Sequence, residues 1–208
     1  INKKEAVCEN PLWVTAKDFD YFSGSEKSGY KRFGVEYKRH FLYLKPDLWL
    51  IYDKIHNDKE NNVISWNLHL RGDLKTIGAY FKSFNDSGLI IYPAEAYKYE
   101  INKGMAQIKL DKLSNDFEEI PWLRFYTDKT GKSEFCNLIH PYKKSSKITV
   151  FRKIDEGCFE ISASGKIYEI FFKSSEKFEI ETDAELVIIE KAGKKKNIRV
   201  ISGTKLFY

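Results

Sequence analysis

Histidines and acidic residues are the side chains that enzymes most often use for catalysis or metal binding, and here they form no recognisable site. None of the histidines belongs to an HxH or HExxH pattern, and GxSxG and the phosphate-binding P-loop are also absent. The four histidines are His40, His56, His69 and His140. We therefore assign no catalytic residue, no metal ligand and no cofactor to this chain. His69 is the best single candidate for ligand contact, and its simplest interpretation is a surface histidine without a catalytic task.

Acidic pairs and cysteines add no chemistry of their own. The pairs at 118–119 and 155–156 lie in predicted loops, whereas glycosidase chemistry needs two carboxylates that face each other across a cleft. The cysteines are widely spaced and form no CxxC, which excludes zinc and redox motifs and allows at most one disulfide. They are Cys8, Cys136 and Cys158.

Aromatic and basic side chains indicate instead a surface for a polysaccharide. Tyr and Trp rings stack on sugar rings, and Arg guanidinium groups match the oxygens of carboxylate and sulfate groups. Core packing is the competing interpretation for each Trp, because aromatic side chains dominate all-β cores. The substrate-binding residues that we predict are Tyr37, Arg39, Trp66, His69, Trp122 and Arg124.

One apolar hairpin, residues 39–53, is the densest element that could position these side chains. Two apolar runs, 41–44 and 48–52, flank Lys45-Pro46-Asp47, and Pro followed by Asp predicts a tight turn. Nearly continuous apolar runs are typical of strands that are covered on both faces. We therefore expect this hairpin at the centre of a sheet.

The rest of the chain reads as short strands. In residues 63–70, Trp66 alternates with Asn67 and His69, which predicts a half-buried antiparallel strand with His69 on its polar face. Further strands, most of about 5–8 residues, follow at turn-bounded spacing, and no helix of ten or more residues is predicted. These strands include 76–84, 107–110 and 177–182. The predicted fold is all-β: a large antiparallel, supersandwich-like β-sandwich with few or no helices.

Residues 1–208 are predicted to form a single β-sandwich region. A composition shift near Pro141 marks 141–146 as an alternative sub-boundary, because the later strands are shorter and richer in Lys. We favour the later strands as a second sheet of the same sandwich. The chain opens with Ile1 and not Met, so we expect a piece of a longer protein.

Charge and hydropathy exclude two classes of partner. The net charge of +5 comes from 35 basic and 30 acidic residues that are dispersed along the chain. Nucleic-acid binding needs a concentrated basic patch, so no nucleic-acid partner is expected. The apolar runs are far shorter than the ~20 residues of a membrane helix, so no membrane span is expected.

Three segments, taken in order, resemble the C-terminal β-sandwich region of heparinase II/III-like proteins, a superfamily of polysaccharide lyases. Residues 37–53, YKRHFLYLKPDLWLIYD, are similar to the family's basic-apolar-KPDYW-apolar-Asp hairpin. Residues 65–70, SWNLHL, are similar to the WxLHL strand that follows it. The segments IPWLRF (120–125) and LIHP (138–141) are similar to a PxLRF and LxxP pair, and the set runs in family order over residues 7–203.

The resemblance implies a parent enzyme that cleaves acidic, uronate-containing polysaccharide by β-elimination. In such lyases a base removes the proton next to the uronate carboxyl group, while a Tyr or His protonates the leaving oxygen. The resemblance also implies an N-terminal α-toroid as the partner domain, a divalent metal in the parent protein, and a periplasmic or cell-envelope location. The family's HxH, Asp and HN motifs precede the matching segments, so no catalytic or metal residue carries over to this chain.

Two positions of the hairpin bear on chemistry. The family often has His at the position of Tyr37, two residues before Arg39, so this chain departs from the family there. Asp53 matches the family's strand-end Asp, and we expect it to be a turn or ladder-end group rather than a base.

We therefore expect the C-terminal β-sandwich of a heparinase II/III-type lyase, inactive alone and forming one wall of the substrate cleft. The alternative, from a different class, is a non-catalytic carbohydrate-binding or structural β-sandwich module linked to cell-envelope polysaccharide. A third interpretation is an inactive relative that takes part in the assembly of cell-envelope polysaccharide.

Overall fold

The chain divides into two compact units, Ile1–Lys144 (unit 1) and Ser145–Tyr208 (unit 2). This division falls within residues 141–146, where the sequence places the alternative sub-boundary. A single sandwich region over residues 1–208 stays a prediction. The structure is a computed structural model that describes residues 8–26, 29–78, 80–84, 88–107, 117–141, 147–173 and 175–207.

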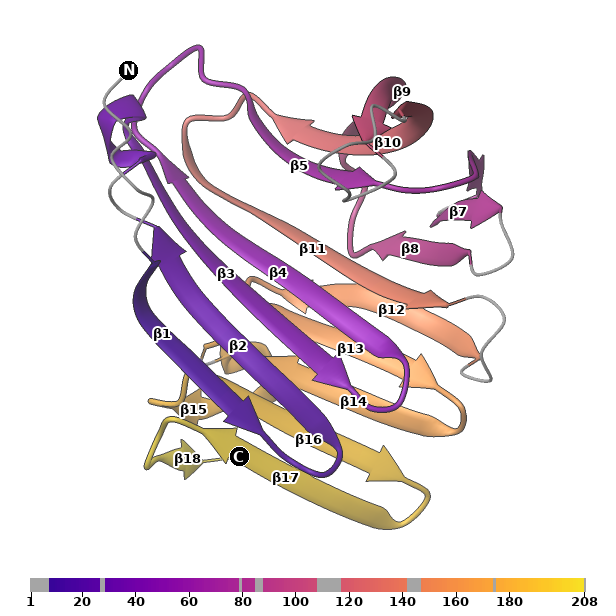
Figure 1. The fold of residues 1–208 in the computed structure, drawn as a ribbon. Helices are drawn as coiled ribbons and strands as arrows, with labels where there is room; N and C mark the ends of the chain where they lie inside the picture. The colour runs from indigo at the N-terminus through magenta and orange to yellow at the C-terminus, as the bar shows by residue number, and fades with distance from the viewer. Residues whose placement is uncertain are drawn as a thin grey trace. The chain divides into compact units, whose positions relative to one another are not determined.

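Regular structure in these described ranges is almost entirely antiparallel β, which confirms the predicted all-β sandwich class (Figure 1). Two three-residue 3-10 turns, η1 (Lys31–Phe33) and η2 (Glu176–Phe178), are the exceptions. Within the described part of the chain, no helix has the length and apolar character needed to cross a membrane. Cys8, Cys136 and Cys158 all lie in the described ranges and form no disulfide there.

Unit 1 contains an eight-stranded sheet in the order β1-β2-β3-β4-β11-β8-β7-β6 and a three-stranded sheet in the order β5-β10-β9. Its strands are β1 (Cys8–Thr15), β2 (Phe19–Glu26), β3 (Val35–Leu44), β4 (Leu48–Asn57), β5 (Ile64–His69), β6 (Asp73–Ile77), β7 (Tyr80–Phe84), β8 (Leu89–Pro93), β9 (Lys98–Gln107), β10 (Phe117–Thr127) and β11 (Gly131–Pro141).

The central hairpin forms as the sequence predicts. β3 and β4 meet at the turn around Pro46 and occupy the third and fourth places of the eight-stranded sheet. Their register pairs Leu42 with Leu50, and both side chains are completely buried. The position of the turn fixes the register of the two strands. Residues that are directly opposite in an antiparallel pair have their side chains on the same face of the sheet, so the turn also decides which side chains of the hairpin are neighbours.

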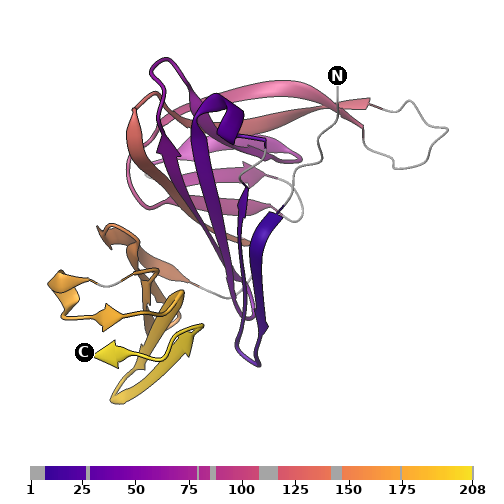
Figure 2. The ribbon, with the colours of Figure 1, turned by 90° about the vertical axis from the view of Figure 1, so that its left-hand side faces the viewer.

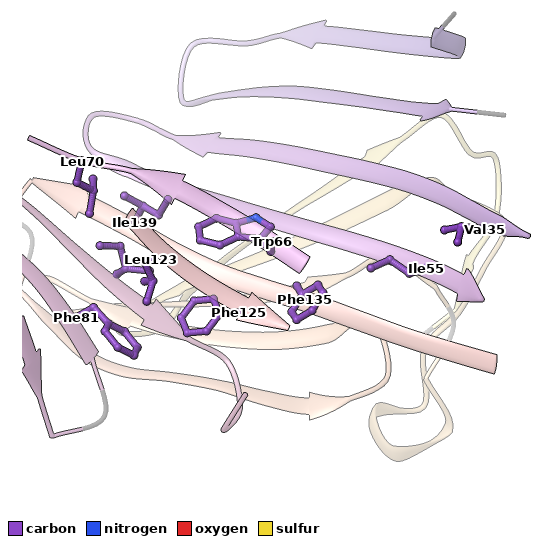
Figure 3. Packing of buried hydrophobic residues seen from close by; sticks show 10 residues of the cluster. Val35, Ile55, Trp66, Leu70, Phe81, Leu123, Phe125, Phe135 and Ile139 are labelled. Carbon is purple, nitrogen blue, oxygen red and sulfur yellow. The ribbon is translucent and has the colours of Figure 1, made fainter. Parts of the chain in front are cut away.

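The two sheets of unit 1 pack face to face through apolar side chains (Figure 3). Trp66 of β5 stacks on Phe125 of β10 with ring centroids 5.7 Å apart, and Phe81 of β7 meets Phe125 edge-on at 5.3 Å. The contact between Phe81 and Phe125 therefore joins the small sheet to the large one. The buried cluster consists of Val35, Ile55, Trp66, Leu70, Phe81, Ile91, Leu123, Phe125, Phe135 and Ile139.

Unit 2 contains a five-stranded sheet in the order β12-β13-β14-β16-β17 and a two-stranded sheet of β15 and β18. Its core includes Cys158, Phe171 and Val187 from the larger sheet together with Ile180 and Ala184. Its strands are β12 (Ile148–Asp155), β13 (Cys158–Ala163), β14 (Lys166–Phe171), β15 (Glu181–Thr182), β16 (Leu186–Ala192), β17 (Lys195–Ile201) and β18 (Leu206–Phe207).

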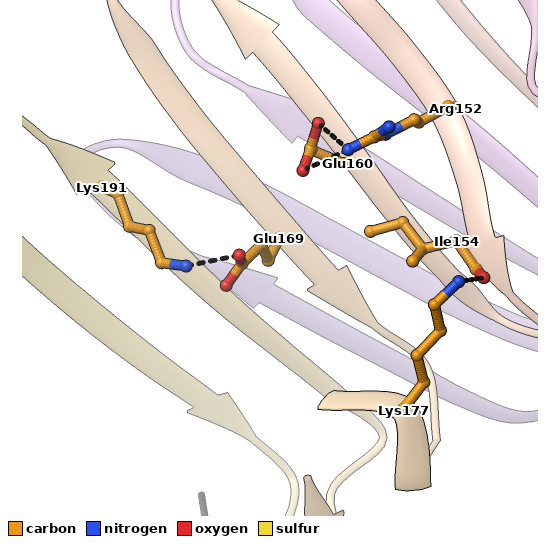
Figure 4. Close-up of polar contacts among 6 residues, drawn as sticks. All are labelled: Arg152, Ile154, Glu160, Glu169, Lys177 and Lys191. Carbon is orange, nitrogen blue, oxygen red and sulfur yellow. Dashed lines mark hydrogen bonds and ion pairs between the residues drawn. The ribbon is translucent and has the colours of Figure 1, made fainter. Parts of the chain in front are cut away.

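A row of charges crosses the larger sheet of unit 2 (Figure 4). Glu160 of β13 lies directly opposite Glu169 of β14, an arrangement that repels when it stands alone. Arg152 lies 3.1 Å from the carboxylate of Glu160, and Lys191 pairs with Glu169. Each glutamate thus has its own cation on the strand that lies on its outer side.

Three predicted strands differ from the structure. The single strand expected over 76–84 is the β6–β7 hairpin, because Gly78 turns the chain with a φ of +58°. The strand expected over 177–182 starts within the turn η2, and Ile180 forms only an isolated bridge with Ser175; Glu181–Thr182 alone of this range pairs as a strand, β15. The strand expected over 107–110 has only Gln107 among the described residues, where it ends β9.

Candidate functional site

A pocket of about 620 Å³ opens in unit 1 where β3, β4 and β11 approach the edge strand β5. Its wall combines aromatic and aliphatic side chains with one arginine, one aspartate and two asparagines. Polar and apolar atoms contribute about equally to the exposed surface of this wall. The lining residues are Tyr30, Phe33, Val35, Tyr37, Arg39, Asp53, Ile55, Asn62, Val63, Ile64, Ser65, Trp66, Asn67 and Phe135.

The rim of the pocket holds apolar side chains that are half exposed. Tyr30 and Phe33 each expose 50% of their surface, and they belong to the segment around the turn η1. The Asn62 amide donates to the backbone oxygen of Phe33 at 2.9 Å and to the side-chain oxygen of Asn57 at 2.9 Å. The first bond ties the turn to the loop after β4, and the second ties that loop to the end of β4, so the rim is built from two segments that are held together.

Arg39 and Asp53 form the polar centre of the pocket. Arg39 Nε and Nη2 donate to the two Asp53 carboxylate oxygens, each at 2.8 Å, and the Tyr37 hydroxyl donates to Oδ1 at 3.1 Å. The Asp53 side chain is only 2% exposed, whereas the Arg39 side chain is 43% exposed. A buried carboxylate thus holds one side of a guanidinium group whose remainder is open to solvent.

The pKa shifts of Tyr37 and Arg39 keep both side chains in one protonation state near neutral pH. Burial, followed by the negative charge of Asp53, raises the pKa of Tyr37 well above its usual range. The hydrogen bond to Asp53 raises the pKa of Arg39 above its ordinary value despite partial burial. Tyr37 therefore stays a neutral phenol and Arg39 a cation, so the pair is suited to binding an anion and unsuited to acting as a general base.

The six residues predicted from the sequence fall in two places. Tyr37, Arg39 and Trp66 line the pocket. Trp66 is also a core residue with 4% exposure, so the core-packing interpretation describes most of its surface.

The other three lie on the outer face of the small sheet, which is the face opposite the core residues Leu123 and Phe125. His69 and Trp122 are cross-strand partners whose rings stack at 5.8 Å, and the exposed position of His69 confirms its prediction on the polar face. Arg124 lies 3.3 Å from Glu100 on β9. β9 and β10 run side by side as the long pink ribbons of Figure 2.

The sequence-based expectation for Asp53 is wrong. β4 continues to Asn57, so Asp53 lies inside the strand and not in a turn or at the end of the ladder. A signal for its partner was available in the sequence, because Arg39 and Asp53 lie seven residues before and seven residues after Pro46. A hairpin centred on Pro46 must pair them.

No three His, Cys, Asp or Glu side chains come together as a metal site in the described ranges. The donor set in this part of the chain therefore does not fit the divalent metal that the family resemblance implies for the parent protein.

No protein-family model matches the sequence, and no curated protein matches it. Several solved structures match its fold. Heparan sulfate lyase HepC from Pedobacter heparinus superposes with a TM-score of 0.58 at 13% identity, covering 95% of this chain and 28% of that chain. The heparinase III gene product BT4657 gives a TM-score of 0.59 at 14% identity, with 94% and 27% covered. A further heparinase III gives 0.58 at 14% identity, with 76% and 26% covered.

At identities this low, the superpositions establish the fold alone, and no residue role is transferred from those proteins to this chain. The chain spans little more than a quarter of the length of these proteins. Its fold is that of a β-sandwich region of heparinase III-type structures.

Proposed function

We propose that this chain is the C-terminal β-sandwich region of a heparinase II/III-like lyase that acts on acidic, uronate-containing polysaccharide by β-elimination. The observation that carries the proposal is the likeness to heparan sulfate lyase HepC over 95% of this chain. The ordered sequence segments point to the same superfamily independently of the fold.

In this proposal the chain supplies one wall of the substrate cleft. β-Elimination needs a base for the proton next to the uronate carboxyl group and an acid for the leaving oxygen. Because the pKa of Tyr37 is raised and Arg39 stays charged, neither side chain can act as the base or pass on a proton near neutral pH. The base and acid would belong to the α-toroid of the parent protein, and this chain alone would be inactive.

Cleavage assays on two proteins test the proposal: the full-length product of the gene that encodes this chain, and this chain alone. Each is incubated with heparin, heparan sulfate and alginate, and the ultraviolet absorbance of the unsaturated uronate product is followed. We expect turnover by the full-length protein on at least one substrate and none by this chain. Turnover by this chain would refute its inactivity, and a full-length protein that cleaves none of the three would refute the lyase assignment.

The outer face of the small sheet favours a second candidate, a non-catalytic carbohydrate-binding module. The stacked rings of His69 and Trp122 lie on that face beside Arg124, outside the wall of the pocket. A glycan array with this chain and its Trp122→Ala variant separates the two functions. Binding that is lost in the folded variant favours the module, and binding that is unchanged rules out the outer face as its site.

A further inference from the structure

Among the described residues, the hydrogen bonds of Arg39 leave three of its five N–H donors unused. A guanidinium group has five N–H donors in one plane. Asp53 takes the Nε hydrogen and one Nη2 hydrogen, which together form one side of the fork. The second Nη2 hydrogen and the two Nη1 hydrogens remain, and two of these point in parallel along the neighbouring Nη1–Nη2 edge. That edge matches a second carboxylate.

The surroundings of this edge suit a sugar that carries a negative charge. Arg39 lines the pocket together with the rings of Tyr30, Phe33 and Tyr37. Arg32 lies 4.6 Å from the ring centroid of Phe33 and adds a positive charge at the rim. The nearby carboxylate of Glu26 is engaged with backbone N–H groups, including that of Tyr30 at 2.9 Å.

We propose that the pocket binds one uronate residue, with its carboxylate on the Nη1–Nη2 edge of Arg39, and that Asp53 is the positioning residue that holds this edge in place. The inference rests on the proposed function and adds to it the group that the cleft wall recognises and the residue that orients it. Tyr37 assists, because its hydroxyl hydrogen bonds to Asp53.

Asp53 matters because a free arginine side chain has many rotamers. Ordering such a side chain on binding costs conformational entropy, and a partner that orders it beforehand removes that cost from binding. Asp53 also neutralises the charge of Arg39. Recognition at this edge therefore depends on the geometry of two parallel hydrogen bonds more than on net charge, and its affinity should vary little with salt.

Isothermal titration calorimetry of this chain tests the proposal with three hexasaccharides. The first is an unsulfated glucuronate–glucosamine hexasaccharide, the second is the same compound with its carboxyl groups reduced to alcohols, and the third is a sulfated heparan hexasaccharide. We expect binding of the first, and a loss of at least tenfold in affinity when its carboxyl groups are reduced. Binding of the sulfated compound alone would overturn the assignment to a carboxylate.

The variants Arg39→Lys and Asp53→Asn test the two roles. Lysine keeps the charge but lacks the planar fork, so we expect roughly tenfold weaker binding, the equivalent of about 1.4 kcal/mol. Asp53→Asn should weaken binding severalfold in the wild-type background and have no further effect in the Arg39→Lys background. A purely structural role for Asp53 would give additive effects.

Arg152→Lys is the matched control, because Arg152 also pairs with a carboxylate but lies in unit 2 (Figure 4). It should bind like the wild type at every salt concentration. Equal affinities for Arg39→Lys and the wild type, or no binding by the folded wild-type chain, would overturn the inference. Neither result would contradict the lyase assignment, because the cleavage assay tests that assignment separately.

Discussion

The ion pair between Arg39 and Asp53 should be asymmetric: removing the arginine should cost more stability than neutralising the aspartate. Arg39→Ala leaves a carboxylate that is 2% exposed and whose remaining side-chain partner, among the described residues, is the Tyr37 hydroxyl. Breaking a buried pair in this way costs about 3–5 kcal/mol of stability. Because the hydrogen bond from Tyr37 remains, we expect a loss at the lower end of this range, about 3 kcal/mol.

Asp53→Asn should be milder. The Arg39 side chain is 43% exposed in the folded protein, so its guanidinium group can be hydrated once the carboxylate is gone. The new amide can still accept one hydrogen bond from it. We expect a loss of about 1 kcal/mol, the range of one intramolecular hydrogen bond. The difference of about 2 kcal/mol between the two variants corresponds to roughly thirtyfold in the unfolding equilibrium.

Urea denaturation followed by tryptophan fluorescence measures this difference in the right part of the chain. All four tryptophans lie before residue 145, so the signal reports on unit 1 alone. With a slope of about 2 kcal/mol per molar urea, the midpoints of the two variants should differ by about 1 M. Arg124→Ala is the control: both partners of its pair with Glu100 are partly exposed, so its loss should stay below about 1 kcal/mol.

Equal losses for Arg39→Ala and Asp53→Asn would refute this account of the pair.

Three further predictions concern the cores and the acid response. Gly203→Ala should destabilise unit 2 by about 1–3 kcal/mol, because its Cβ would lie 2.6 Å from that of Ala184; thermal melting by circular dichroism should show this loss while the fluorescence transition of unit 1 stays unchanged. Leu123→Ala, at a completely buried position, should lower the stability of unit 1 by about 2–5 kcal/mol, and an unchanged urea midpoint would contradict its place in the core. Hydrogen bonds from Thr204 and Lys205, that of the Lys205 N–H foremost, lower the pKa of Asp183. The ionised Asp183 therefore stabilises the folded state at neutral pH, and this stabilisation is lost as the pH falls. Asp183→Asn should make the thermal melting of unit 2 less sensitive to acid between pH 5 and about pH 3.

Much of the candidate site was within reach of local sequence rules. The turn at Pro46 and the antiparallel register together require that Arg39 face Asp53. The alternation of Trp66 with His69 along one strand also requires that these side chains lie on opposite faces. The six predicted binding residues could therefore never have formed one surface.

Tertiary structure alone decided what surrounds this pair. β5 follows β4 in the chain but pairs with β10, more than fifty residues later, and the small sheet so formed buries Trp66 against Phe125. That pairing places the edge of β5 beside Arg39 and closes the pocket. Strand pairing at such separations depends on which apolar faces fit together in the folded core, and no local pattern of residues encodes that choice.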